Sequence, residues 1–175
     1  MSRALQTVLM VLLLSCVGCD QATKILAKSH LATRSPLEYL NGAVRMQYAE
    51  NAGAFLSLGA ELPERARFLL FVGLVCPLLL TGLAFAFRSE RMALAQKLGM
   101  IVAVGGGIGN VIDRIAHGAV VDFVSLGIGP LRTGIFNLAD VAIIAGLLLF
   151  LSAGARETET GPPVAARTPS STIEG

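Results

Sequence analysis

Four long apolar segments constrain the fold of this chain more than any other feature of its sequence. A helix that crosses a bilayer needs roughly 20 consecutive apolar residues. Hydrophobic residues make up 54% of the chain and charged residues only 15%, whereas soluble domains usually carry about 25% charged residues. We therefore predict an integral membrane α-helical protein, a bundle of four transmembrane helices. The predicted spans are residues 4–27, 66–87, 95–114 and 134–153.

The segments between the spans predict two extracytoplasmic loops, at about residues 28–65 and 115–133. The first contains "EYLNGAVRMQYAENAGAF", in which short alternating runs flank turn-prone Asn-Gly and Asn-Ala-Gly. This pattern favours a small β-rich element outside the membrane. The second contains "VSLGIGPLRTG", which is rich in glycine and is expected to be a mobile loop.

A single membrane domain is expected over residues 1–155. Residues 156–175 are rich in Pro, Thr, Ser and Ala and predict a disordered tail. Four spans put both termini on one side of the membrane. The positive-inside rule makes this side cytoplasmic, because cations gather near the termini and in the second connection, at Arg3, Arg88, Arg91, Lys97 and Arg156.

Glutamates and aspartates lie in different parts of the sequence. Every glutamate lies in a loop or tail, whereas every aspartate lies in or beside an apolar segment, at Asp20, Asp113, Asp122 and Asp140. In a four-span protein the odd spans end where the even spans begin. All four aspartates therefore fall at one membrane face, the outer face if the termini are inside. Ionisable groups at such a depth are costly and commonly functional.

Two of the aspartates have cations nearby in the sequence. Lys24 follows Asp20 by four residues, in the acid-first order that helices favour. This pair is either structural or in contact with substrate, and Lys24 is expected to reach the outer interface by snorkelling. Asp113 is followed by Arg114 and, four residues on, by His117, so we expect a structural role for it.

The other two aspartates, Asp122 and Asp140, have no cation within four residues. Two carboxylates brought together cannot both ionise cheaply, so they share a proton. One can then accept a proton from water while the other donates one to a carbonyl oxygen or leaving nitrogen, which is aspartic-protease chemistry. Two alternatives stay open: a proton-coupled carrier that uses the pair as a relay, and a non-catalytic membrane scaffold.

Several other functions have little support. The net charge is +2 without a basic tract, so no nucleic-acid partner is expected. Two histidines without an HExxH motif give no metal site. "GGGIGN" lies inside an apolar run with no preceding strand, so it does not predict a nucleotide site. Its Gly105 and Gly109 instead form GxxxG, which lets helices pack closely in lipid.

The first apolar segment also allows a second interpretation. Arg3, a short apolar stretch and "LLSC" together resemble a lipoprotein signal peptide that would be cut before Cys16. However, Ile25, Leu26 and Ala27 continue the apolar pattern beyond that point. We therefore expect one helix that continues past Cys16.

Five motifs in order resemble one known family, lipoprotein signal peptidase, also called signal peptidase II. They are "DQATK" (20–24), "NAGAF" (51–55), "GGGIGNVIDR" (105–114), "VVDF" (120–123) and "FNLAD" (136–140). The resemblance implies a membrane aspartyl endopeptidase of the bacterial cytoplasmic (inner) membrane, with its active site at the periplasmic face. Such an enzyme cuts prolipoproteins just before a diacylglyceryl-cysteine. The family fold is a four-helix bundle with a small periplasmic β-cradle.

The resemblance also assigns roles to residues of this chain. Asp122 and Asp140 would be the catalytic pair, and Asp20 and Lys24 would support the first helix and the site wall. The residues expected to line the site, and to bind the substrate backbone or hold the pair, are Asn51, Asn110, Arg114 and Asn137. Gly53 would allow close backbone packing. Membrane lipid and globomycin-type inhibitors are implied as partners, and no metal or organic cofactor is implied.

Overall fold

The computed structural model describes residues 1–54 and 57–159. Its elements, in chain order, are α1 (Arg3–Leu31), β1 (Leu37–Tyr39), β2 (Val44–Asn51), α2 (Glu64–Phe68), the π-helical turn η2 (Leu69–Leu74), α3 (Val75–Arg88), α4 (Leu94–His117), β3 (Val120–Ile128), β4 (Leu131–Arg132) and α5 (Leu138–Glu159).

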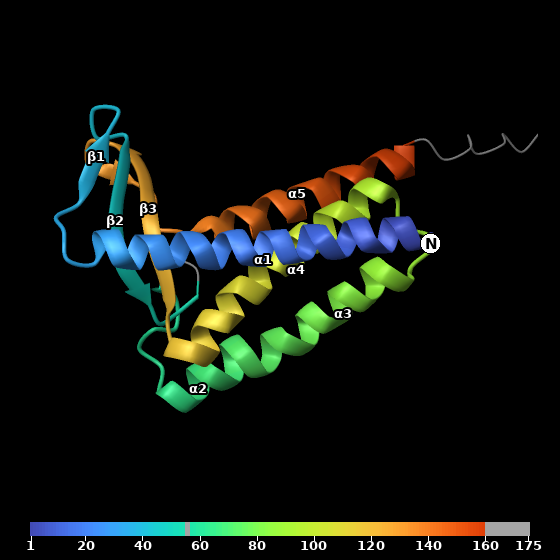
Figure 1. Ribbon diagram of the computed structural model, residues 1–175, viewed down its shortest axis with the longest axis horizontal. Coiled ribbons are helices and arrows are strands. Elements are labelled where there is room, and N and C mark those ends of the chain that lie inside the picture. Colours follow the sequence, from blue (N-terminus) through green and yellow to red (C-terminus); the bar gives the residue numbers. More distant parts are fainter. Residues whose placement is uncertain (55–56, 160–175) are drawn as a thin grey trace, which may run out of the picture.

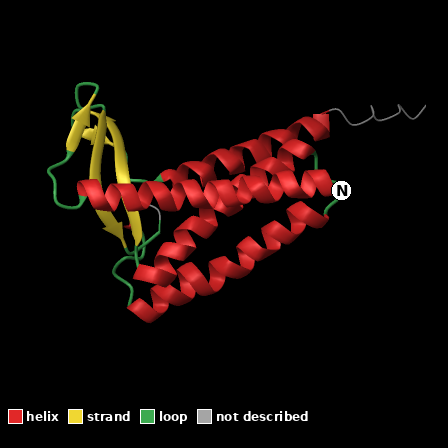
Figure 2. Cartoon of the chain, viewed as in Figure 1, coloured by secondary structure: helices red, strands yellow, loops and turns green. Residues whose placement is uncertain are grey.

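The long helices form a bundle with a small sheet at one end, as Figure 1 and Figure 2 show. Within the described residues, four helices are long and apolar enough to cross a membrane: Arg3–Leu31, Glu64–Arg88, Leu94–His117 and Leu138–Ala155. The second of these comprises α2, η2 and α3 without a break. The predicted fold class, a four-helix membrane bundle with a small β-rich element, is confirmed.

Helix α1 is continuous from Arg3 to Leu31 and so passes through Cys16 without interruption. Helix α5 extends to Glu159, four residues beyond the predicted end of the membrane domain. The remainder of the predicted tail, residues 160–175, lies outside the described residues.

The sheet is antiparallel with the order β1-β2-β3-β4. Strand β2 comes from the connection between the first and second spans, as expected, but its central partner β3 comes from the connection between the third and fourth spans. The glycine-rich segment was expected to be a loop, and it instead forms strands β3 and β4. Val120, Val121 and Phe123 are buried, and such β-branched and aromatic side chains pack well on a pleated surface. One register pair, Ala49 opposite Asp122, fixes that aspartate next to the end of β2.

Helix α4 lies at the centre of the bundle. Its residues Ile101 and Val104 form a buried cluster with Leu9 and Leu13 of α1 and Ala86 of α3. A second cluster, formed by Ala27, Leu31 and Phe123, joins the end of α1 to the sheet. Many leucines on the other helices remain exposed, as expected for surfaces that face lipid.

Lys97 differs from the prediction of a connecting-loop cation. It lies in the first turn of α4, is buried, and donates to the backbone oxygens of Ala86 (3.2 Å) and Ser89 (2.5 Å) at the end of α3. It therefore satisfies carbonyl groups that the helix end leaves open.

Glycines on α4 let the neighbouring helices approach closely. A Cβ at Gly105 would meet Cys16 of α1, and one at Gly109 would meet the Asp20 carboxylate. A Cβ at Gly106 would meet the Ala139 carbonyl of α5. The predicted GxxxG packing is thus present between α4 and α1, and the glycine beside it serves α5.

We expect Gly106→Ala to lower the free energy of unfolding by about 1–3 kcal/mol, because overpacking a tight interface forces backbone shifts. The Ile143 side chain, 3.0 Å from the added carbon, restricts relaxation. Thermal unfolding in detergent measures the effect. The matched control is Gly18→Ala in α1, where the added carbon meets nothing within 4 Å. Equal stability of the two variants would contradict the close α4–α5 contact.

Candidate functional site

A cavity of about 630 Å³ opens at the sheet end of the bundle. Asp122 reaches it from β3 and Asp140 from the first turn of α5. The two aspartates that lack a cation nearby in the sequence therefore lie in one site. The other walls are mainly apolar and come from η2, α3, α4 and α5, with Phe71, Val75, Val111, Ile143, Ile144 and Leu148 among the lining residues.

Asp122 is almost completely buried, with 3% of its surface exposed. Two amide groups hold its carboxylate: Asn137 Nδ2 donates to Oδ1 at 2.7 Å and Asn51 Nδ2 donates to Oδ2 at 3.1 Å. Asn51 ends β2, and the β2–β3 register brings it beside Asp122. Each carboxylate oxygen thus has a fixed donor, which leaves little rotational freedom.

Asn137 and Asp140 form a reciprocal cap at the start of α5. The Asp140 backbone N–H donates to Asn137 Oδ1 at 2.9 Å, and the Asn137 N–H donates to Asp140 Oδ2 at 3.2 Å. This is the capping-box arrangement of two helix-end groups. The Asn137 Nδ2 group points to Asp122.

Asn110 connects Asp140 to Lys24 and Asn137. Its Nδ2 donates to Asp140 Oδ1 at 2.9 Å. Its Oδ1 accepts from Lys24 Nζ at 2.8 Å and from Asn137 Nδ2 at 3.2 Å. Two donors fix the position of Asn110 Oδ1. The NH₂ group on the other side of the amide therefore has to point toward Asp140.

Lys24 is buried between two carboxylates rather than snorkelling to the interface, so that expectation is wrong. Its Nζ lies 2.7 Å from Asp20 Oδ2 and 2.9 Å from Asp113 Oδ2. The predicted Asp20–Lys24 pair is present. Asp113, however, pairs with Lys24 of α1 rather than with its sequence neighbours Arg114 and His117.

The two carboxylates of this cluster also hold backbone groups next to the cavity aspartates. Asp20 Oδ1 accepts from the Ala139 N–H at 2.9 Å, one residue before Asp140. Asp113 Oδ2 accepts from the Val121 N–H at 3.4 Å, one residue before Asp122. The buried Asp20–Lys24–Asp113 cluster therefore ties the start of α5 and the start of β3 to α1.

One member of this network was missed from the sequence. Gln21 Nε2 donates to Asp113 Oδ1 at 3.0 Å and to the Gly109 carbonyl at 3.2 Å. The only sequence signal for Gln21 was its place inside the "DQATK" motif, directly after Asp20.

The hydrogen bonds of Arg114 go to backbone carbonyls rather than to an aspartate. It donates to the carbonyls of Gly53 and Asn110, and its guanidinium lies 5.2 Å from the centre of the Phe71 ring. Gly53 is buried, and a Cβ there would collide with the backbone of Ser57 and Leu58. The close packing predicted for Gly53 is thus present. Phe55, the last residue of that motif, lies outside the described residues.

A family model described as signal peptidase (SPase) II matches residues 12–155 of this sequence. The chain belongs to the signal peptidase II family. The resemblance found from the five motifs is therefore confirmed. Signal peptidase II proteins are proteases. The four long apolar helices are consistent with a protease that lies in the membrane.

Several relatives cover most of this signal peptidase II sequence. Proteins named lipoprotein signal peptidase from Caldicellulosiruptor bescii and Beijerinckia indica are both 34% identical, over 79% and 85% of this chain and 85% and 87% of theirs. One from Xanthomonas euvesicatoria is 35% identical over 83% of this chain. A solved bacterial membrane enzyme shares the fold, with a TM-score of 0.77 at 23% identity, over 90% of this chain and 93% of that one.

Burial raises the pKa of Asp122 to about 6 in this signal peptidase II family member, and the neighbouring Asp140 carboxylate acts in the same direction. The hydrogen bonds from Asn51 and Asn137 and the charge of Lys24 oppose this rise. Asp122 thus holds a proton at a higher pH than an ordinary aspartate.

We expect Asn51→Ala to raise the pKa of Asp122 above about 6. The donor to the carboxylate is lost, so the charged form is less stable and the proton is retained to higher pH. A pH titration followed by NMR of ¹³C-labelled aspartate carboxyl groups measures this. Gln47→Ala, on the same strand, is the control and leaves the titration unchanged. An Asp122 pKa that stays the same or falls in Asn51→Ala would contradict the account.

Proposed function

We propose that this chain is an aspartic endopeptidase that removes the signal peptide from diacylglyceryl-modified bacterial prolipoproteins by cutting just before the lipidated cysteine. Asp122 and Asp140 are its catalytic pair. The observation that carries the proposal is that these two aspartates, 18 positions apart in sequence, line one cavity and are held there by Asn51, Asn110 and Asn137. Membership of the signal peptidase II family supports it.

The burial of Asp122 and its raised pKa support a division of labour between the two carboxyls. The raised pKa of Asp122 makes it the holder of the shared proton, and Asp140 is the base. Asp140 accepts a proton from water as the oxygen attacks the scissile carbonyl carbon, and Asp122 donates its proton to the carbonyl oxygen. The tetrahedral intermediate then collapses: the C–N bond breaks as Asp140 gives its proton to the leaving nitrogen, and a hydroxyl proton returns to Asp122 as the carbonyl re-forms.

The position of the cavity supports a substrate held in the membrane. Apolar residues of α3 and α5 line one side of the cavity, and the aspartates lie where the helices meet the sheet. A transmembrane signal peptide can lie along the helices with its cleavage point at the aspartates. Globomycin-type inhibitors are proposed to occupy the same cavity.

The arrangement of charges supports an orientation in the bacterial cytoplasmic membrane. The N-terminus of α1, the α3–α4 connection and the end of α5 lie together at the end opposite the sheet (Figure 1). This end carries Arg3, Arg88 and Arg91. By the positive-inside rule we propose that it is cytoplasmic, with the sheet and the catalytic pair at the periplasmic face.

We expect cleavage to depend on the lipid of the substrate cysteine. Purified protein in detergent is given one prolipoprotein in two forms, with and without the diacylglyceryl group, and cleavage is followed by gel shift. The lipidated form is cut at least about tenfold faster, because the anchor holds the bond at the depth of the aspartates and so lowers the entropic cost of alignment. Equal rates on both forms would contradict the proposed substrate.

A further inference from the structure

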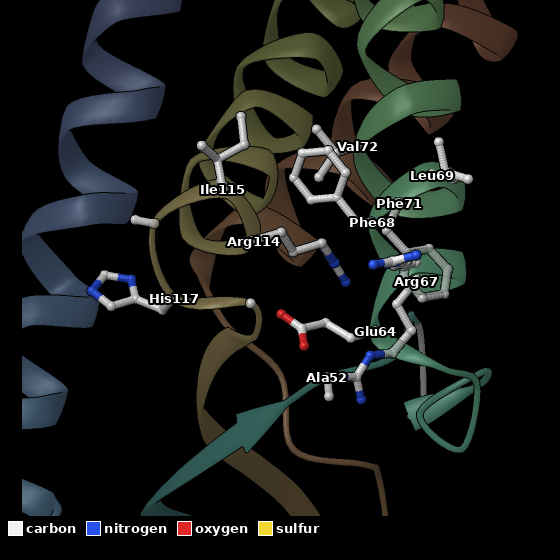
Figure 3. Close-up of a pocket in the computed structure, with 13 residues that line it drawn as sticks. Ala52, Glu64, Arg67, Phe68, Leu69, Phe71, Val72, Arg114, Ile115 and His117 are labelled. Atoms are coloured by element: carbon white, nitrogen blue, oxygen red, sulfur yellow. The ribbon is translucent and has the colours of Figure 1, made fainter.

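A second cavity, of about 720 Å³, lies between the start of the second span and the end of α4. Glu64, Arg65 and Arg67 of α2 line it together with Arg114 and His117 of α4. Figure 3 shows Arg67 on one side and Arg114 and His117 on the other. Neither Asp122 nor Asp140 lines it. It is therefore separate from the proposed catalytic cavity, although Arg114 and Phe71 border both.

The cavity concentrates positive charge. Three arginines line it against one glutamate. Figure 3 shows Arg67 and Arg114 pointing toward the same space from opposite sides. Within residues 1–54 and 57–159, no ion pair within 4.0 Å joins Glu64 to either of them. Two guanidinium groups facing one space repel each other unless an anion lies between them.

The guanidinium groups of Arg67 and Arg114 also have N–H donors without a hydrogen-bond acceptor. Arg67 Nη1 donates to the Ala60 carbonyl at 3.0 Å, and Arg114 contacts the carbonyls of Asn110 and Gly53. In the part of the chain that the structure describes, the buried side-chain nitrogens without a hydrogen-bond partner are Arg67 Nε and Arg114 Nε. A guanidinium carries five N–H donors in a planar fork that suits the oxygens of a phosphate.

The walls indicate that the anion belongs to an amphiphile. Phe68, Leu69 and Ile115 border the cavity and are 51%, 66% and 60% exposed. The second span begins here and α4 ends here, so the cavity lies where the helices leave the bilayer. A phosphate at this depth can keep its acyl chains against the apolar side chains. A free phosphate ion would gain nothing from them.

We propose that this cavity binds the phosphate of an anionic membrane phospholipid, with Arg65, Arg67 and Arg114 around the headgroup and Phe68, Leu69 and Ile115 along the acyl chain. The site is a lipid site additional to the catalytic cavity. Its test needs no cleavage and so does not depend on the proposed peptidase activity.

Native mass spectrometry of delipidated protein, offered phosphatidylglycerol and phosphatidylcholine in equal amounts, tests the proposal. The unsubstituted protein is expected to retain phosphatidylglycerol with a preference of about tenfold, since charge-assisted contacts commonly contribute that much. The double variant Arg65→Gln/Arg67→Gln loses the preference. The control variant Arg88→Gln/Arg91→Gln removes the same charge at the other end of the bundle and is expected to keep the preference for phosphatidylglycerol.

Several outcomes would overturn the proposal. One is equal retention of the two lipids by the unsubstituted protein, and another is an unchanged preference in Arg65→Gln/Arg67→Gln. The third is binding of inorganic phosphate, offered alone, that depends on the same arginines while the lipid does not bind. If the double variant does not fold, Arg65→Gln alone, at an exposed position, is expected to lower the preference several-fold, and no change there would also overturn it.

Discussion

Replacing either cavity aspartate with asparagine, in Asp122→Asn or Asp140→Asn, is expected to lower the rate of prolipoprotein cleavage by roughly a thousandfold or more. Asparagine keeps the size of the side chain and an oxygen that can accept from Asn110 or Asn137. It cannot accept a proton from water or donate one as an acid. The proposed shared-proton pair is therefore expected to fail when either member is changed.

The double variant Asp122→Asn/Asp140→Asn should be no slower than the single variants, because residues that act as a unit show non-additive losses. The control is Glu38→Gln, which makes the same chemical change in the exposed Arg45–Glu38 pair of the sheet. Its cleavage rate should stay unchanged. Thermal unfolding of each variant shows whether the fold is retained. A rate near that of the unsubstituted protein in either single variant would refute the assignment of Asp122 and Asp140 as the catalytic pair.

The second large effect is expected at Lys24. In Lys24→Met, the carboxylates of Asp20 and Asp113 stay buried without their shared cation, and Asn110 loses one of the two donors to its oxygen. Breaking a buried ion pair by removing one partner commonly costs about 3–5 kcal/mol. We expect a loss of this size in the free energy of unfolding, measured in detergent.

Two further variants test whether the loss of stability comes from the buried Asp20–Lys24–Asp113 cluster or from the loss of any positive charge on α1. Lys28→Met, one turn later on the exposed side of α1, should change stability by less than about 0.5 kcal/mol. Adding Asp20→Asn and Asp113→Asn to Lys24→Met removes the unpaired charges and should recover part of the lost stability. A Lys24→Met protein as stable as Lys28→Met would show that the cluster is not held together as described.

The residues that could be placed from the sequence were those fixed by span count. Four apolar segments require that Asp20, Asp113, Asp122 and Asp140 share one end of the bundle, and the structure places all four there. The Asp20–Lys24 pair could also be found because both residues lie on one helix, four positions apart. Such local and topological patterns need no knowledge of packing.

The partners that come from distant segments could not be found in this way. Lys24 was expected at the interface because only Asp20 is near it in sequence, whereas Asp113 lies 89 residues later on α4. Nothing near Asn137 in the sequence identifies the partner of its side-chain amide either. Its actual partner Asp122 lies on β3, whose β-branched run Val120–Val121 was the overlooked sign of a strand.

The most direct test of the central claim is the mass of the product that the purified protein releases from a diacylglyceryl prolipoprotein, with Asp140→Asn measured in parallel. We predict that the unsubstituted protein yields a lipoprotein whose first residue is the lipidated cysteine, and that Asp140→Asn leaves the precursor intact. The same product from both proteins, or a folded unsubstituted protein that yields none, would contradict an aspartic peptidase built on Asp122 and Asp140.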